Sequence, residues 1–223
     1  MKKKALVIHS GGMDSSLCLA LAIQEHGVQN VLSLSFSYHQ SHTAELVQAE
    51  KICKDWKVDH TVISIECLRE ITENALTHPK KIAIQQLANQ PPTTLVQGRN
   101  GLMARLGAIH ANYLQAHIIY MGVIEVDSGN SGYRDCSRAY MDMKQTLLRM
   151  DLGDPLFEIR TPLVQMSKKE TLILANQMGI LEYLLEETVT CYRGLRRQGC
   201  EECPACVLRN EGLRAFYAES ASI

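Results

Sequence analysis

Short apolar runs alternate along the chain with longer stretches in which apolar residues recur at helical spacing. The runs are nearly continuous in Val, Ile and Leu, as in strands buried on both faces. Strands that alternate with helices predict an α/β fold with a parallel sheet and crossover helices. The expected strands are 6–8, 31–36, 58–65, 118–123 and 157–160. The expected helices are 16–24, 43–56, 101–115, 138–150, 168–178 and 208–217.

Residues 66–97 show no sustained period, in contrast to the rest of the chain. We expect one helix over 68–76, and the Asn-Gln-Pro-Pro sequence at 89–92 predicts a break. The segment is interpreted as a lid or connection.

Length and charge limit the function. The 223 residues suit one large α/β domain, alone or with a small appendage. A formal net charge of −1 offers no general basic field, which disfavours a polynucleotide substrate. The apolar run after Lys2–Lys4 is too short for a signal peptide, and no stretch suits a membrane span. We therefore expect a cytoplasmic protein without membrane or nucleic-acid partners.

A glycine-rich loop at 10–15, Ser-Gly-Gly-Met-Asp-Ser, joins the first expected strand to the first helix. Glycines let a backbone approach an anion closely, and a helix N-terminus offers unpaired N–H groups and a positive dipole end. The loop is neither a Walker A sequence nor Gly-x-Gly-x-x-Gly. The alternative is a plain turn with a serine N-cap.

Four of the eight cysteines gather near the C-terminus. Cys-x2-Cys spacing lets one turn present two sulfurs to the same ion, so we predict a structural zinc site. A disulfide framework is disfavoured without a secretion signal, whereas a redox role and an iron–sulfur cluster are alternatives. The expected ligands are Cys191, Cys200, Cys203 and Cys206.

The loop resembles the pyrophosphate loop of the ATP pyrophosphatase superfamily, Ser-Gly-Gly-x-Asp-Ser. That resemblance implies a Rossmann-like parallel sheet of the adenine nucleotide alpha hydrolase type, with helices on both faces. It also implies cleavage of ATP between its α and β phosphates, with Mg2+ on the phosphates. We expect a nucleotide-binding domain over 1–187 and a zinc-binding segment over 188–223. The residues assigned to the nucleotide are His9, Ser10, Gly11, Gly12, Met13, Asp14, Ser15, Ser16, Leu17, Cys18 and Leu19.

Further strings, in order, resemble the 7-cyano-7-deazaguanine synthase family, also called QueC. The family implies adenylation of 7-carboxy-7-deazaguanine, attack by ammonia to give an amide, and a second adenylation that yields the nitrile. A homodimer is the family expectation. The strings lie at 36–42, 98–100, 131–136, 161–163, 167–170 and 190–192.

The resemblance suggests residue roles. Lys168 would bind phosphate and Arg99 phosphate or carboxylate, although either could be a surface cation instead. Tyr133 would stack on the deazaguanine and Asp135 would accept from its guanidine-like edge. The expected catalytic residues are Asp14, Ser15, Arg99 and Lys168. The expected substrate residues are Tyr38, Gln40, Gly98, Arg99, Asn100, Tyr133, Asp135 and Cys136.

The sequence departs from the family at the expected substrate side. Gln97 and Arg134 stand where the family usually has proline. The turn-rich loop at 127–130 is about two residues longer than the corresponding loop of the family. The alternative is an enzyme that stops at the amide or joins the carboxylate to another amine, even one on a protein. Rivals are a tRNA thiolase or lysidine-type ligase, disfavoured by charge, and a zinc-knuckle binding module, which leaves the glycine loop unexplained.

Overall fold

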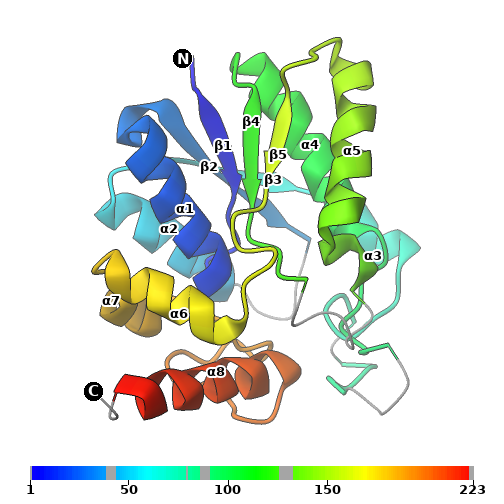
Figure 1. Cartoon of the computed structure of the whole chain (residues 1–223). Helices are drawn as coiled ribbons and strands as arrows, with labels where there is room; N and C mark the ends of the chain where they lie inside the picture. Colours follow the sequence, from blue (N-terminus) through cyan, green and yellow to red (C-terminus); the bar gives the residue numbers. More distant parts are fainter. Residues whose placement is uncertain (1, 39–43, 79, 86–90, 126–132, 221–223) are drawn as a thin grey trace.

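The fold centres on one five-stranded sheet (Figure 1). The computed structural model describes residues 2–38, 44–78, 80–85, 91–125 and 133–220. All neighbouring strands are parallel, in the order β3-β2-β1-β4-β5, which confirms the predicted α/β class. The strands are β1 (Ala5–Ile8), β2 (Val31–Ser37), β3 (Asp59–Ser64), β4 (Ile118–Met121) and β5 (Glu158–Arg160).

Helices cover both faces of the sheet, as expected. In Figure 1, α1 and α2 lie on one side of the sheet, and α4 and α5 lie on the other. The last three helices gather near the carboxyl end of the strands, with α8 lowest in that view. The helices are α1 (Met13–His26), α2 (Ala44–Asp55), α3 (Cys67–Ile71), α4 (Arg99–Tyr113), α5 (Arg138–Leu152), α6 (Lys168–Gln177), α7 (Leu181–Glu187) and α8 (Pro204–Ser220). Short 3-10 turns η1 (Val28–Asn30) and η2 (Arg134–Cys136) complete the elements.

Alternating side chains of the central strands pack into two separate hydrophobic cores, one on each face of the sheet. Leu6 and Leu34 are fully buried in the core that includes α4 and α5. Val7 and Val31 are fully buried in the core that includes α1 and parts of α6 and α7. Each strand therefore contributes apolar surface to both sides, which explains the continuous apolar runs in the sequence.

The helix expected over 68–76 is wrong in its extent, because α3 ends at Ile71. Thr72 adopts an extended backbone. The Asn74 side chain then accepts hydrogen bonds from the amides of Leu76 and Thr77. Such a local side-chain turn competes with helix formation, and the apolar period did not reveal it.

The strand order places the glycine loop at a special position. Strands β1 and β4 are neighbours, and the chain runs outward from them in both directions. The carboxyl ends of such a pair form the crevice at which doubly wound sheets bind ligands. The loop at 10–15 leaves the carboxyl end of β1 and enters α1.

Gly11 allows this loop to lie against the start of α2. Its φ is +87°, and a Cβ there would stand 2.1 Å from the Glu45 carbonyl oxygen and 2.9 Å from the Ala49 amide nitrogen. Both obstacles are backbone atoms, so neither can rotate away. The contact sets the distance between the loop and α2.

We predict that Gly11→Ala lowers the free energy of unfolding by more than about 3 kcal/mol, because backbone must shift as well as φ. Gly153→Ala is the matched control, since Gly153 has a φ of +62° and no atom within 4 Å of the added Cβ. That control should lose only about 1–2 kcal/mol, the cost of the left-handed backbone alone. Denaturant unfolding measures both, and equal losses would contradict the role of the contact.

Candidate active site

Serine hydroxyls hold the glycine loop in a compact turn. Ser15 Oγ donates to the Gly12 carbonyl at 3.0 Å and accepts from the Ser10 amide at 3.1 Å. Ser10 Oγ lies 3.0 Å from Ser15 Oγ and accepts from the Gly12 amide at 3.2 Å. The loop is therefore preorganised by its own side chains.

The N-terminus of α1 presents backbone donors at this loop. Its N-cap is Gly12, and no side chain caps the helix. Gly122, just after β4, lets the helix start come close, since a Cβ there would lie 2.8 Å from the Ser15 amide nitrogen. An uncapped helix start with a glycine at its tip suits an anionic ligand.

An ion pair joins the loop to α6. Lys168 Nζ lies 2.7 Å from Asp14 Oδ1 and 2.6 Å from Oδ2. The Lys168 side chain is only 6% exposed, so it is not the solvated lysine that sequence alone allowed. Ser167 and Glu170 form a capping box that fixes this end of α6. The ammonium is thus held at the edge of the anion site.

A cavity of about 720 Å³ extends from the loop toward α4 and the C-terminal segment. Its lining includes polar groups of the loop and of α4 together with the apolar side chains of Met103, Met121 and Phe36. Its volume is in the range of small-molecule sites. The predicted residues that line it are His9, Ser10, Gly12, Met13, Asp14, Ser15, Tyr38, Arg99, Asn100, Tyr133, Cys136 and Lys168.

Arg99 brings positive charge to the far end of the cavity. Its guanidinium donates from Nη1 to Tyr38 Oη at 3.3 Å and lies 5.9 Å from the centre of the Tyr38 ring. Its Nε is buried and has no hydrogen-bond partner among the described residues. Thr190 also lines the cavity, and its Oγ1 is likewise buried without a hydrogen-bond partner among the described residues. Buried polar atoms without partners are rare, and here both border a space where a ligand could satisfy them.

Tyrosines frame the same end. Tyr133 Oη lies 2.7 Å from Thr94 Oγ1. Burial, together with a contact to Tyr133, raises the pKa of Tyr192 well above its usual value. The Tyr192 phenol is therefore neutral, and the rings of Tyr133 and Tyr192 can stack on a planar ligand.

Asp135 and Cys136 contact Asn100 in the first turn of α4. Asp135 Oδ2 accepts from the Asn100 amide at 3.1 Å, and Asp135 is buried and does not line the cavity. Asn100 Nδ2 lies 3.4 Å from Cys136 Sγ. Burial raises the pKa of Cys136 to about 12, so its sulfur is a thiol at neutral pH and a poor nucleophile.

Several predicted residues lie away from the cavity. Leu17, Cys18 and Leu19 are buried in the core on α1 and pack against the sheet. Gly98 has a left-handed φ of +74° and begins α4 without lining the cavity. Ser16 is buried beneath the loop. Gln40 and the longer loop at 127–130 lie outside the described residues.

Glu45, Gly122 and Thr190 were missed by sequence reasoning. Glu45 lines the cavity from the first turn of α2. Burial raises the pKa of Glu45 to about 7, partly offset by the Arg99 charge. No loop motif contains it, so only the packing of α2 against Gly11 brings it to the site.

Glu45 should make stability depend on pH. Its folded pKa lies above the ordinary carboxyl value, so the unfolded chain loses this proton first as pH rises. The free energy of unfolding should therefore fall between about pH 4.5 and pH 7 because of Glu45. In Glu45→Gln that part of the fall should vanish.

Denaturant unfolding at pH 5 and pH 8 measures the change. Glu50→Gln, on the exposed side of the same helix, is the control and should keep the wild-type dependence. An identical pH dependence in Glu45→Gln and wild type would show that the carboxyl is not held protonated.

The four C-terminal cysteines come together as predicted. One ligand atom from each lies within 4.8 Å of the others. The amide of Arg193 donates to Cys191 Sγ and that of Cys203 to Cys200 Sγ, both at 3.3 Å, as around metal-bound thiolates. Gly199, with a φ of +70°, is needed because a Cβ would stand 2.4 Å from Cys206 Sγ. The donor set fits a tetrahedral thiophilic ion such as Zn2+.

The cysteine cluster is tied to the Lys168 side of the cavity through α8. This helix starts at Pro204, inside the cluster, earlier than the expected start at 208, because proline suits a first helical position. Gly212 on α8 packs against Lys168, where a Cβ would lie 2.8 Å from Cγ. Metal binding would thus support the position of Lys168.

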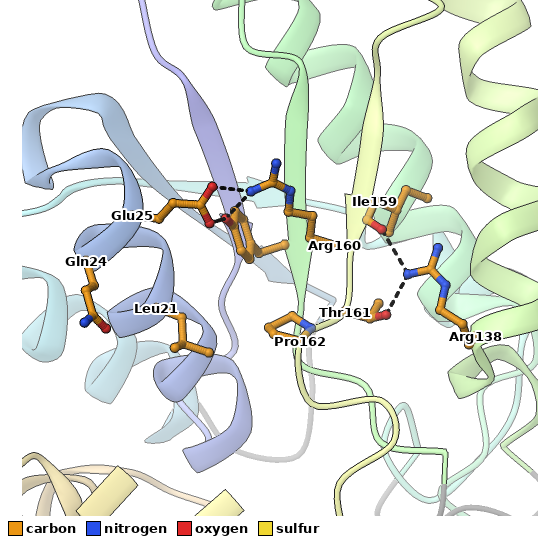
Figure 2. A pocket seen from close by; sticks show the side chains of 9 residues that line it. Leu21, Gln24, Glu25, Arg138, Ile159, Arg160, Thr161 and Pro162 are labelled. Carbon is orange, nitrogen blue, oxygen red and sulfur yellow. Dashed lines mark hydrogen bonds and ion pairs between the residues drawn. The ribbon is translucent and has the colours of Figure 1, made fainter. Parts of the chain in front are cut away.

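A second cavity, of about 640 Å³, lies between α1 and β5 (Figure 2). Arg160 Nη1 pairs with Glu25 Oε1 at 2.5 Å, and Arg138 Nη1 donates to Thr161 Oγ1 at 2.8 Å. Both arginines are already engaged by the protein. We assign no ligand to this cavity.

Comparison with known proteins agrees with the fold. A family model described as queuosine biosynthesis protein QueC matches residues 4–217. An NH3-dependent NAD synthetase from Campylobacter jejuni subsp. jejuni NCTC 11168 has a TM-score of 0.53 at 18% identity, over 82% of this chain and 67% of that one. The U34-tRNA thiolase NcsA from Methanococcus maripaludis has a TM-score of 0.50 at 14% identity, over 97% and 73%.

The parallel sheet with the loop at its switch point, together with the match to the QueC model, identifies an ATP-using enzyme of the pyrophosphate-loop class. The family model that matches residues 4–217 narrows this class to one family. The chain belongs to the QueC family. None of the helices in the described part of the chain is both long and apolar enough to cross a membrane.

Proposed function

We propose that the enzyme adenylates the carboxylate of 7-carboxy-7-deazaguanine with ATP and uses ammonia to form 7-cyano-7-deazaguanine. One observation carries this proposal. A single cavity is lined by a helix N-terminus suited to polyphosphate and also by Arg99, two tyrosines and buried polar atoms that have no partner among the described residues. A nucleotide and a planar acid can therefore meet within one cavity.

The phosphate end would promote the first step. A carboxylate oxygen attacks the α-phosphorus of ATP, and pyrophosphate leaves with its electrons. Donors from Gly12 to Ser15 and the Lys168 ammonium stabilise the charge that gathers on the leaving group. Asp14, whose oxygens keep lone pairs beyond Lys168, would hold Mg2+, and the ion would supply charge neutralisation there.

The substrate end would orient the acid. The Arg99 guanidinium lines the cavity and offers charge to a carboxylate, and Thr190 offers a hydroxyl whose oxygen has no hydrogen-bond partner in the described part of the chain. Ammonia then attacks the acyl carbon, AMP leaves, and a proton is lost to give the amide. Adenylation of the amide oxygen by a second ATP, followed by loss of AMP and a proton, yields the nitrile.

Glu45 is placed to take part in proton movement. A carboxyl with a pKa of about 7 can accept a proton from an incoming ammonium and release it again near neutral pH. It lines the same cavity as Arg99. We propose it as the acid–base group of the amine step.

A second candidate product is suggested by the positions near the substrate at which this sequence differs from the family pattern. Gln97 and Arg134 replace prolines of the family pattern, which alters the backbone before Gly98 and after Tyr133. If these changes admit a larger nucleophile, the activated acid would be joined to another amine, including one on a protein, or the reaction would stop at the amide. The product therefore has to be identified directly.

The partners follow from the same proposal. We propose a cytoplasmic homodimer that binds small molecules. We also propose that it binds no nucleic acid, because the formal net charge is only −1. Residues 1–187 would form the nucleotide domain and 188–223 the zinc-binding segment.

Purified enzyme with ATP, ammonium and 7-carboxy-7-deazaguanine should release AMP and pyrophosphate and form the nitrile, identified by mass spectrometry. Other planar carboxylates should release far less AMP. Amide or conjugate in place of nitrile would support the second candidate product. No AMP release with this acid would reject the proposed substrate.

Lys168→Met should lower kcat for AMP release about 100-fold, as expected for loss of one charged donor to the leaving group. The neighbouring Lys169, which pairs with Glu219 at 2.6 Å on the surface, supplies the control. Lys169→Met should keep kcat within about twofold, since exposed pairs contribute little. Steady-state kinetics decides, and equal effects of the two variants would remove Lys168 from the mechanism.

A further inference from the structure

A second cluster of metal-binding side chains lies beneath the phosphate loop. His9 follows β1, Cys53 is on α2, and His60 is on β3. One ligand atom from each lies within 4.8 Å of the other two. His9 and Cys53 are each 1% exposed, whereas His60 is partly exposed on an edge strand. The sequence gives no motif for this cluster, because its members are brought together from three elements.

Hydrogen bonds fix which nitrogen of His9 faces the cluster. Ser16 Oγ donates its only proton to the Gly12 carbonyl at 2.9 Å. It must therefore accept from His9 Nε2, 2.9 Å away. Nδ1 of His9 is left as an acceptor, 3.0 Å from Ser33 Oγ and 3.7 Å from Cys53 Sγ.

One nitrogen of the cluster is left without a partner in the described part of the chain. Ser33 Oγ also lies 3.0 Å from His60 Nδ1, so it can donate to His9 Nδ1 and accept from His60 Nδ1. His60 Nε2 is buried and has no hydrogen-bond partner among the described residues. Two imidazoles and a thiol that converge in this way form a good ligand set for a metal ion.

The spacing agrees with coordination. Typical zinc bonds of about 2.0–2.1 Å to nitrogen and 2.3 Å to sulfur place the two atoms about 3.6 Å apart across a tetrahedral angle. His9 Nδ1 and Cys53 Sγ are 3.7 Å apart. The donor set of two nitrogens and one sulfur selects a borderline-soft ion over Mg2+ or Ca2+.

We propose that His9, Cys53 and His60 bind a second divalent cation of the Zn2+ type, with Ser33 Oγ or a water as the fourth ligand. His9 ligates through Nδ1 and Cys53 as the thiolate. The contact from His9 Nε2 to Ser16 and on to Gly12 is the outer hydrogen bond that metal-bound histidines commonly make. The cation thereby braces the loop through His9 and Ser16.

Metal analysis of the full-length protein tests the site. The wild-type protein is loaded with Zn2+ and desalted, and its zinc content per chain is measured by elemental mass spectrometry. We expect two equivalents per chain. Cys53→Ala and His60→Gln should each lose one equivalent. Cys67→Ala is the matched control, because Cys67 is an exposed cysteine outside both clusters, and it should keep two.

A further variant separates the two clusters. Cys203→Ser should lose the C-terminal equivalent and keep the one that depends on Cys53 and His60. If Cys53→Ala does not fold, as judged by circular dichroism, His60→Gln on the partly exposed edge strand decides alone. Unchanged zinc content in His60→Gln relative to Cys67→Ala would overturn the proposal.

Discussion

The ion pair between Asp14 and Lys168 joins two halves of the molecule that are far apart in sequence. Asp14 begins α1, directly after the loop, and Lys168 begins α6. Because Lys168 is buried, it needs this partner, and it also places a cation beside the anion site. The nucleotide end of the cavity depends on that pairing being made before any ligand arrives.

Other contacts support the same arrangement from outside. Gly212 lets α8 press on Lys168, and α8 starts within the cysteine cluster. Gly11 lets the loop rest against α2, which in turn carries Glu45 into the cavity. The metal-binding segment and the first helices thus hold one site from opposite sides. The site and the fold both depend on these close approaches, with Gly11 against the backbone of α2 and Gly212 against the Lys168 side chain.

Sequence periodicity predicted the sheet, its parallel class and most helices, because buried strands and amphipathic helices leave long apolar signals. It did not predict the early end of α3, which depends on a side-chain turn at Asn74. Motifs predicted the loop and the four cysteines. They did not indicate Glu45, whose place arises from packing between distant segments, and the family string at 190–192 did not single out Thr190 as a site residue. Asp135 matched a motif, yet its carboxylate holds the start of α4.

The central claim is that the loop at the tip of α1 holds the polyphosphate of ATP. A structure determined with a non-hydrolysable ATP analogue tests it most directly. The account predicts β- and γ-phosphates on the backbone amides of Gly12 to Ser15, with the Lys168 ammonium beside them. Phosphates bound elsewhere, such as at Arg138 and Arg160 in the second cavity, would contradict it.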